Sequence, residues 1–268
     1  MYGLGLEILN ILFSHKFRGF IVGGFPRDMY LGKESKDIDI ATNATYDDLV
    51  KIFNTVKLCG NNNFMSYVLY YKGSTFQITT FRKDISYENN RKPIEQIKVD
   101  TIEEDLLRRD FIINTLCIDK DGKYVDIMGA MKDMDNKIIR TVNNPDISFK
   151  EDALRMLRCI RFATVLGFDI DSKTKEAIIN NKDLIRNLSP FRRKQELDKI
   201  FSDINYQKGL DLIKELSLEE VLSIKIGNNI YGDNYLLIWS QIEFSDDYPF
   251  TREEKRIISR NREYTYTR

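Results

Sequence analysis

The sequence predicts an α+β fold, in which a mixed α/β domain over residues 1–145 is followed by a helical region over residues 146–268. Short stretches that alternate polar and apolar residues, such as KDIDIAT at 36–42 and STFQITTFR at 74–82, are typical of half-buried strands. These signals fade near NNPD at 143–146, and apolar residues then recur at helical spacing. A chain of 268 residues is long enough for more than one domain.

The first elements follow from local patterns. MYGLGLEILNILF at the start reads as an amphipathic helix, and FRGFIVGG at 17–24 as a short buried strand that ends in glycines. PRDMYLG predicts a helical turn with Pro26 at its first position. A helix over TYDDLVKIFNTV has Thr45 as its N-cap, and its inward residues are Leu49, Val50, Ile52 and Phe53.

Later elements complete the first domain and begin the second. SYVLYYKG at 66–73 and the strand after it predict a hairpin around Gly73, and the polar residues 84–98 predict a mobile loop. TIEEDLLRRDFIINTLCID opens a predicted helix with Thr101 as its cap and Glu104 at the capping-box position. Beyond residue 150 the predicted helices are 149–168, 172–187 and 191–216.

Composition narrows the classes of protein. With 42% hydrophobic and 31% charged residues, and no apolar run near the roughly 20 residues of a membrane span, we expect a soluble protein without a membrane partner. Cys59, Cys117 and Cys159 form no CxxC pair, which favours a reducing, cytoplasmic setting over disulfides or zinc. The single histidine, His15, leaves little for imidazole chemistry. Because the formal charge is zero, a nucleic-acid partner requires basic residues gathered on one face.

Two aspartates separated by one residue form the first candidate site. Side chains two apart on a strand share a face, so Asp37 and Asp39 present their carboxylates together. Mg²⁺ takes a few carboxylates and keeps its other positions for water and phosphate oxygens. We therefore predict these two residues as catalytic metal ligands, with a solvated strand end as the alternative.

The residues before them suggest a phosphate site. Gly23 and Gly24 precede a helical turn, where backbone N–H groups can approach an anion because no Cβ intervenes. Arg27 can add a forked guanidinium. A tight turn is the alternative for the glycines, but a phosphate cradle, an arginine and a carboxylate pair together are what phosphoryl or nucleotidyl transfer requires.

A second constellation lies in EDALR at 151–155. On a helix, Asp152 and Arg155 face the same way, and a surface ion pair is the simplest interpretation. Alternatively, the carboxylate accepts from an exocyclic amino group while the guanidinium donates to a ring acceptor. Cytosine and adenine share that pattern, whereas uracil and guanine do not. The pair would then admit CTP and ATP and reject UTP and GTP.

Four motifs resemble one family. GGFPRDMYLG followed by KDIDIAT is similar to the signature of the class II tRNA nucleotidyltransferase (CCA-adding) and bacterial poly(A) polymerase family, in the polymerase-β superfamily. EEDLLRRDFIINTL, EDALRMLRCIRFATVLGF and LSPFRRKQELDKI resemble its later motifs, in family order. The resemblance implies a polymerase-β-like nucleotidyltransferase head with a mixed sheet, followed by an all-helical neck and shortened body.

The resemblance also implies a reaction and residue roles. It implies transfer of CMP and AMP from CTP and ATP to the 3′ end of tRNA, with Asp37 and Asp39 holding Mg²⁺. The residues expected to bind the nucleotide are Gly24, Arg27, Arg109, Asp110, Asn114, Asp152, Arg155, Arg158 and Arg161. Helix anchoring is the alternative for Asp110 and Asn114, and a solvated helix face for Arg158 and Arg161. Basic residues that could contact the RNA backbone, or form a charged helix face, are Arg186, Arg192, Arg193 and Lys194.

One departure from the family concerns the metal site. Gln77 stands where the family has an acidic residue, the expected third carboxylate. An amide cannot act as a general base at neutral pH. Either Asp37 and Asp39 suffice, another carboxylate such as Asp84 substitutes, or activity is reduced.

Two further features bear on the reaction's outcome. FRKDISYENNRKP resembles the family's flexible loop and favours full CCA addition, with Tyr87, Arg91 and Pro93 in place and Asn89 where aspartate is usual. Family members are usually longer, so we expect compact tRNA binding, weak binding, or a second subunit in a homodimer. Poly(A) synthesis, partial CC- or A-only addition, and a non-catalytic nucleotide- or RNA-binding module stay open as alternatives.

Overall fold

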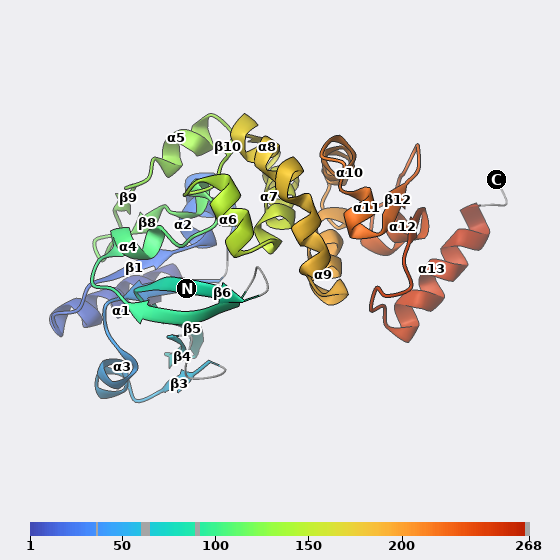
Figure 1. The fold of residues 1–268 in the computed structure, drawn as a ribbon. Coiled ribbons are helices and arrows are strands. Elements are labelled where there is room, and N and C mark those ends of the chain that lie inside the picture. Colours follow the sequence, from blue (N-terminus) through green and yellow to red (C-terminus); the bar gives the residue numbers. More distant parts are fainter. Residues whose placement is uncertain (36, 60–64, 89–91, 266–268) are drawn as a thin grey trace. The chain divides into compact units, whose positions relative to one another are not determined.

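The computed structural model describes residues 1–35, 37–59, 65–88 and 92–265 (Figure 1). Within these, the chain divides into two compact units. The first consists mainly of residues 1–143, and the second contains residues 137–139 and everything described from residue 144 onward. No helix in the described ranges is long and apolar enough to cross a bilayer.

A mixed seven-stranded sheet organises the first unit, as predicted. Its strand order is β3-β4-β5-β2-β1-β8-β9. Only β2 and β5 run parallel, and every other neighbouring pair is antiparallel. The strands are β1 (Gly19–Val22), β2 (Asp39–Thr42), β3 (Val56–Leu58), β4 (Ser66–Tyr71), β5 (Ser74–Thr80), β8 (Cys117–Ile118) and β9 (Tyr124–Val125).

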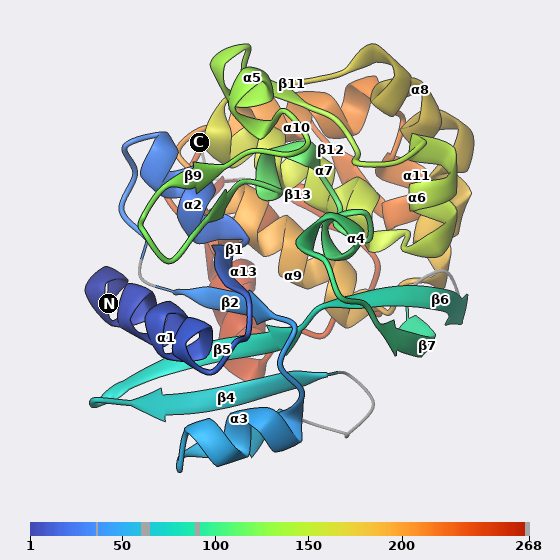
Figure 2. The ribbon, with the colours of Figure 1, turned by 90° about the vertical axis from the view of Figure 1, so that its left-hand side faces the viewer.

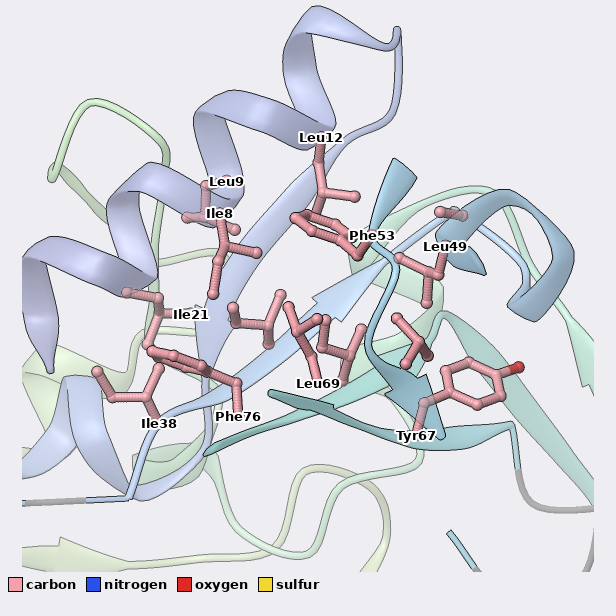
Figure 3. Packing of buried hydrophobic residues seen from close by; sticks show 14 of the residues in the cluster. Ile8, Leu9, Leu12, Ile21, Ile38, Leu49, Phe53, Tyr67, Leu69 and Phe76 are labelled. Carbon is pink, nitrogen blue, oxygen red and sulfur yellow. The ribbon is translucent and has the colours of Figure 1, made fainter. Parts of the chain in front are cut away.

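One face of this sheet is covered by two amphipathic helices, α1 (Tyr2–Ser14) and α3 (Tyr46–Ile52) (Figure 2). Ile8 and Leu12 of α1 pack with Leu49 and Phe53 over the apolar side chains of the strands (Figure 3). Gly19 permits the close approach of α1, since a Cβ there would lie 3.0 Å from Leu9 Cδ2. Burial of this apolar surface is what holds the sheet and helices together.

The opposite face packs against α4 (Ile102–Leu106) through a second cluster that contains Val22, Ala41 and Cys117. Because strand residues alternate, Ile38 and Ile40 enter the first core and Asp39 lies on the second face with Ala41. The remaining helices of this unit are α2 (Gly24–Tyr30), η2 (Ile112–Asn114) and α5 (Ala130–Asp135).

Several local predictions for this unit are confirmed. Thr45 caps α3 in a capping box with Asp48. The β4–β5 hairpin turns at Lys72 and Gly73, which both have positive φ. The prediction that Val50 of α3 faces inward is wrong, since the residue is 43% exposed.

The prediction of a mobile loop over residues 84–98 is wrong. Strands β6 (Arg82–Glu88) and β7 (Lys92–Lys98) form a two-stranded sheet. Ile85 and Ile97 are both exposed. Both strands consist mostly of polar residues, so the sequence shows no apolar alternation over them.

Helices dominate the second unit, as predicted. They are α6 (Pro145–Glu151), α7 (Leu154–Leu166), α8 (Ser172–Asn181), η3 (Lys182–Asn187), α9 (Pro190–Phe201), α10 (Tyr206–Glu215), α11 (Glu219–Leu222), α12 (Tyr235–Ser240) and α13 (Arg252–Thr265). Gly209 of α10 lets this helix pack closely on its neighbours, because a Cβ there would clash with Ile200 and Thr164.

The region is not entirely helical, which corrects the all-helical prediction in detail. A parallel ladder joins β10 (Ile138–Ile139) to β11 (Asp169–Ile170), and an antiparallel ladder joins β12 (Ile224–Ile226) to β13 (Ile242–Phe244). Strands of two or three residues are too short to show alternation. The buried Trp239 stacks edge-on with Phe201 and Phe244, which ties α9, α12 and β13 together.

Candidate active site

The sheet places Asp39 at the start of β2, opposite Val22 on β1 and in parallel register with Gln77 on β5. Asp39 is half-buried, whereas Asp37 is exposed. Burial raises the pKa of Asp39, the Arg109 guanidinium opposes that rise, and the Asp37 carboxylate adds to it. The charges of Arg109 and Asp37 thus both act on the Asp39 carboxyl.

The glycine turn lies directly beside these carboxylates. Gly23 has φ +80°, and a Cβ at this position would lie 3.2 Å from Asp39 Oδ2. Both the left-handed backbone and the close approach require glycine. Gly24 is the first residue of α2, so this helix begins two residues before the predicted start at Pro26.

Arg27 is buried and anchors α2 to η2. Its Nε and Nη2 donate to Asp28 Oδ1 at 2.8 and 2.7 Å, and its Nη1 donates to Asn114 Oδ1 at 2.6 Å. Asn114 Nδ2 in turn donates to Asp110 Oδ1 at 3.0 Å. Three residues predicted to bind the nucleotide thus form one network, and their contact with phosphate or ribose stays a prediction.

The prediction that the helix opened by Thr101 continues past Asp110 and Asn114 is wrong, although Thr101 is confirmed as its N-cap. The α-helix ends at Leu106, and Asp110 and Asn114 belong to the turn around η2. Ile112 N–H donates to the Arg140 carbonyl, and the chain then enters the sheet at β8. Tertiary pairing has overridden helical propensity here.

Asp105 is a site residue that the sequence analysis missed. Its carboxylate is completely buried and accepts from Arg108 Nη2 at 2.8 Å and from Arg109 Nη2 at 3.1 Å. The spacing of four between Asp105 and Arg109 is a signal that could have identified it.

Gln77 lies beside Asp39 in the position expected for a third carboxylate. Across the described ranges, no three His, Cys, Asp or Glu side chains come together as metal ligands. Asp84 therefore does not complete a three-carboxylate site, and its Oδ1 accepts instead from Gln96 Nε2 at 2.6 Å.

In the second unit, Asp152 and Arg155 do not share one continuous helix as predicted. Asp152 is the C-cap of α6, and its Oδ1 accepts from the Leu154 N–H at 3.0 Å, at the start of α7. A short acidic side chain competes with the helix for backbone donors and so produces this break. Arg155 is buried and donates to Ser148 Oγ at 2.8 Å.

The next two arginines of α7 both lie over the Phe162 ring, with the Arg158 guanidinium at 5.4 Å and the Arg161 guanidinium at 4.3 Å from its centre. Arg161 Nε also donates to the buried Glu196 at 2.6 Å. Burial would raise the pKa of Glu196, but the Arg161 guanidinium holds that pKa below its usual value. Arg161 is thereby fixed to α9.

Two residues predicted to contact RNA are buried. Arg193 donates to Asp247 at 3.1 Å, and Lys194 donates to Asp198 and Glu254 at 2.8 Å each. Their burial removes Arg193 and Lys194 from contact with an RNA backbone.

The other two residues predicted to contact RNA are Arg186 and Arg192, which lie at the surface. In the family's flexible loop, Asn89 and Arg91 lie outside the described residues, as do the side chains of Tyr87 and Pro93.

Two family models and several curated relatives match this chain. Residues 19–140 match the family described as the poly A polymerase head domain, and residues 167–223 match the probable RNA and SrmB-binding site of polymerase A. The CCA-adding enzyme of Bacillus pumilus is 38% identical over 217 residues, which make up 81% of this chain and 54% of that enzyme. The chain thus spans about half the length of the curated relatives it matches.

Solved structures show the same fold. The CCA-adding enzyme of Bacillus stearothermophilus in complex with CTP is 33% identical, with a TM-score of 0.75 over 82% of this chain and 53% of that one. The Thermotoga maritima CCA-adding enzyme complexed with tRNA is 22% identical and has a TM-score of 0.77 over 99% of this chain and 70% of that one. With its head motifs, its mixed sheet and these relatives in agreement, the chain belongs to the family of class II tRNA nucleotidyltransferases and bacterial poly(A) polymerases.

Proposed function

We propose that this protein is a template-independent nucleotidyltransferase that adds CMP and AMP, from CTP and ATP, to the 3′ end of tRNA. The observation that carries the proposal is the close approach of the Gly23 turn to the half-buried Asp39, on whose carboxyl the charges of Asp37 and Arg109 act. The similarity to a CCA-adding enzyme crystallised with CTP supports the choice of substrate.

The carboxylate pair fits Mg²⁺. Two neighbouring acidic side chains, one of them half-buried with a raised pKa, carry a repulsion that a divalent cation relieves. When bound, Mg²⁺ supplies neutralisation of the triphosphate and a lower pKa for the RNA 3′-hydroxyl. That oxygen forms a bond to the α-phosphorus and loses its proton, while the bond from this phosphorus to pyrophosphate breaks.

The chain's other residues bind and orient the substrates. Gly24, Arg27 and Arg109 hold the phosphate groups, and Asp110 with Asn114 holds the ribose. In the second unit, the Asp152 carboxylate accepts from the exocyclic amino group of cytosine or adenine and Arg155 donates to the ring nitrogen. Arg158 and Arg161 complete the nucleotide contacts.

The partners follow from this reaction. They are the tRNA 3′ end and the two nucleoside triphosphates. A second copy of this chain, in a homodimer, is a separate proposal. The three cysteines are free thiols, which suits a reducing cytoplasm.

One assay tests the proposal against its alternatives. The protein is incubated with tRNA that ends at its discriminator base, Mg²⁺ and CTP with ATP, and the product ends are sequenced. We expect CCA. A long A tail would instead support a poly(A) polymerase, the alternative within the same family.

Two other outcomes would change the assigned function. Addition of CC or A alone would narrow the activity, and nucleotide binding without extension would support a binding module that lacks a third carboxylate at Gln77. Asp39→Asn should abolish extension, whereas the control Asp121→Asn, at an exposed turn, should retain it.

A further inference from the structure

The Asp105 carboxylate has no contact with bulk solvent, yet it binds Arg109, a residue of the proposed active site. Its side chain is 0% exposed. Oδ1 accepts from Arg108 Nε at 3.0 Å, from Arg108 Nη2 at 2.8 Å and from the Arg82 backbone N–H at 3.2 Å. Oδ2 accepts from Arg109 Nη2 at 3.1 Å. Each oxygen therefore serves a different arginine side chain.

The Asp105 carboxylate is shared by two guanidinium groups. They belong to Arg108 and Arg109, whose side chains are 17% and 13% exposed. Arg109 Nε is buried and has no hydrogen-bond partner within the described residues. A buried charged donor is costly unless it is satisfied, and a phosphate oxygen is a ligand atom that could satisfy this Nε–H.

Asp105 fixes one end of the Arg109 side chain, since its Oδ2 accepts from Arg109 Nη2. The guanidinium that is held in this way also acts electrostatically on the half-buried Asp39. A long side chain held at one end in this way loses little further freedom when a ligand binds.

We propose that Asp105 is the positioning residue of this site, and that its carboxylate holds the Arg109 guanidinium in the orientation that receives the phosphate groups of the nucleotide. The inference rests on the proposed function, since it deepens the binding of CTP and ATP. It assigns to a buried aspartate, which touches no substrate, control over the affinity for the triphosphate.

Calorimetric titration of the full chain with CTP, with Ca²⁺ in place of Mg²⁺ to prevent turnover, tests this role. Asp105→Asn and Arg109→Gln should each weaken CTP binding about tenfold, the scale of one charge-assisted hydrogen bond. Asp133→Asn is the matched control, because Asp133 is buried in the same unit and accepts from Arg140 at 2.7 Å. It should keep CTP affinity within about twofold.

The double variant separates positioning from a general structural effect. If Asp105 acts through Arg109, then Asp105→Asn combined with Arg109→Gln should bind CTP no more weakly than Arg109→Gln alone. In steady-state kinetics the same variants should raise KM for CTP and leave KM for the RNA unchanged. Should Asp105→Asn fail to fold, the charge-balanced pair Asp105→Asn with Arg108→Gln replaces it.

Two results would overturn the inference. One is CTP affinity in Asp105→Asn equal to that of Asp133→Asn, and the other is a double variant whose loss is the product of the two single losses. A wild-type chain that does not bind CTP would instead overturn the proposed function, and the inference with it.

Discussion

Replacing Gln77 with glutamate tests whether the metal site is limited by its number of carboxylates. Gln77 lies in register with Asp39, on strands about 4.8 Å apart. Two unit charges at that separation repel by about 3.5 kcal/mol at an effective dielectric constant of 20 and by about 0.9 kcal/mol in water. Because Gln77 is exposed, solvent screening places the repulsion near the lower value, about 1 kcal/mol.

The sign of the effect depends on the metal. The pKa of Asp39 already lies above its usual value, chiefly through burial, and Gln77→Glu raises it further. When folding raises the pKa of a carboxyl, the free energy of unfolding decreases as the pH rises through that pKa. At neutral pH the metal-free variant is therefore destabilised by the full repulsion. Bound Mg²⁺ reverses the penalty, since a third carboxylate then adds attraction.

Thermal unfolding with EDTA and with Mg²⁺ measures both effects. In EDTA the melting temperature of Gln77→Glu should fall by about 2–4 °C, whereas Mg²⁺ should stabilise the variant more than the wild type. Calorimetric affinity for Mg²⁺ should rise about fivefold. Gln96→Ala is the control, because it removes the hydrogen bond to Asp84 without adding a carboxylate and should lose stability without any gain from Mg²⁺. Equal melting temperatures for wild type and Gln77→Glu in both buffers would refute the reasoning.

Three further predictions concern other parts of the site. Gly23→Ala should reduce extension more than a hundredfold, whereas Gly129→Ala, with the same φ of +80° and nothing within 4 Å of its added Cβ, should cost only about 1 kcal/mol of stability. The affinity for Mg²⁺, measured as a function of pH, should decrease when the pH drops below the raised pKa of Asp39. Arg109→Gln should shift this decrease to higher pH, because the Arg109 cation no longer lowers the pKa of Asp39. Arg155→Ala should raise UTP incorporation relative to CTP about tenfold in single-nucleotide extension, and unchanged selectivity would remove this residue from base reading.

Local chemistry explains which parts of the fold were predictable. The Thr45 cap, the turn at Gly73 and the alternation around Asp39 each depend on neighbours within a few residues, and the structure has all three. The breaks after Leu106 and at Asp152 depend on partners elsewhere or on one side chain competing for backbone donors. Helical periodicity in the sequence continues through both breaks, so it could not reveal them.

The motif arginines show why residue types were easier to predict than their surroundings. A motif identifies Arg109 and Arg161 as cations, but each is held by a buried carboxylate, Asp105 or Glu196. A guanidinium needs such an anchor because its side chain otherwise samples many rotamers, and a phosphate or base must then pay for ordering it. The anchor lies four residues from Arg109 and thirty-five from Arg161. Only the first distance is short enough to be recognised from sequence, so the orientation of Arg161 is a property of how α7 packs on α9.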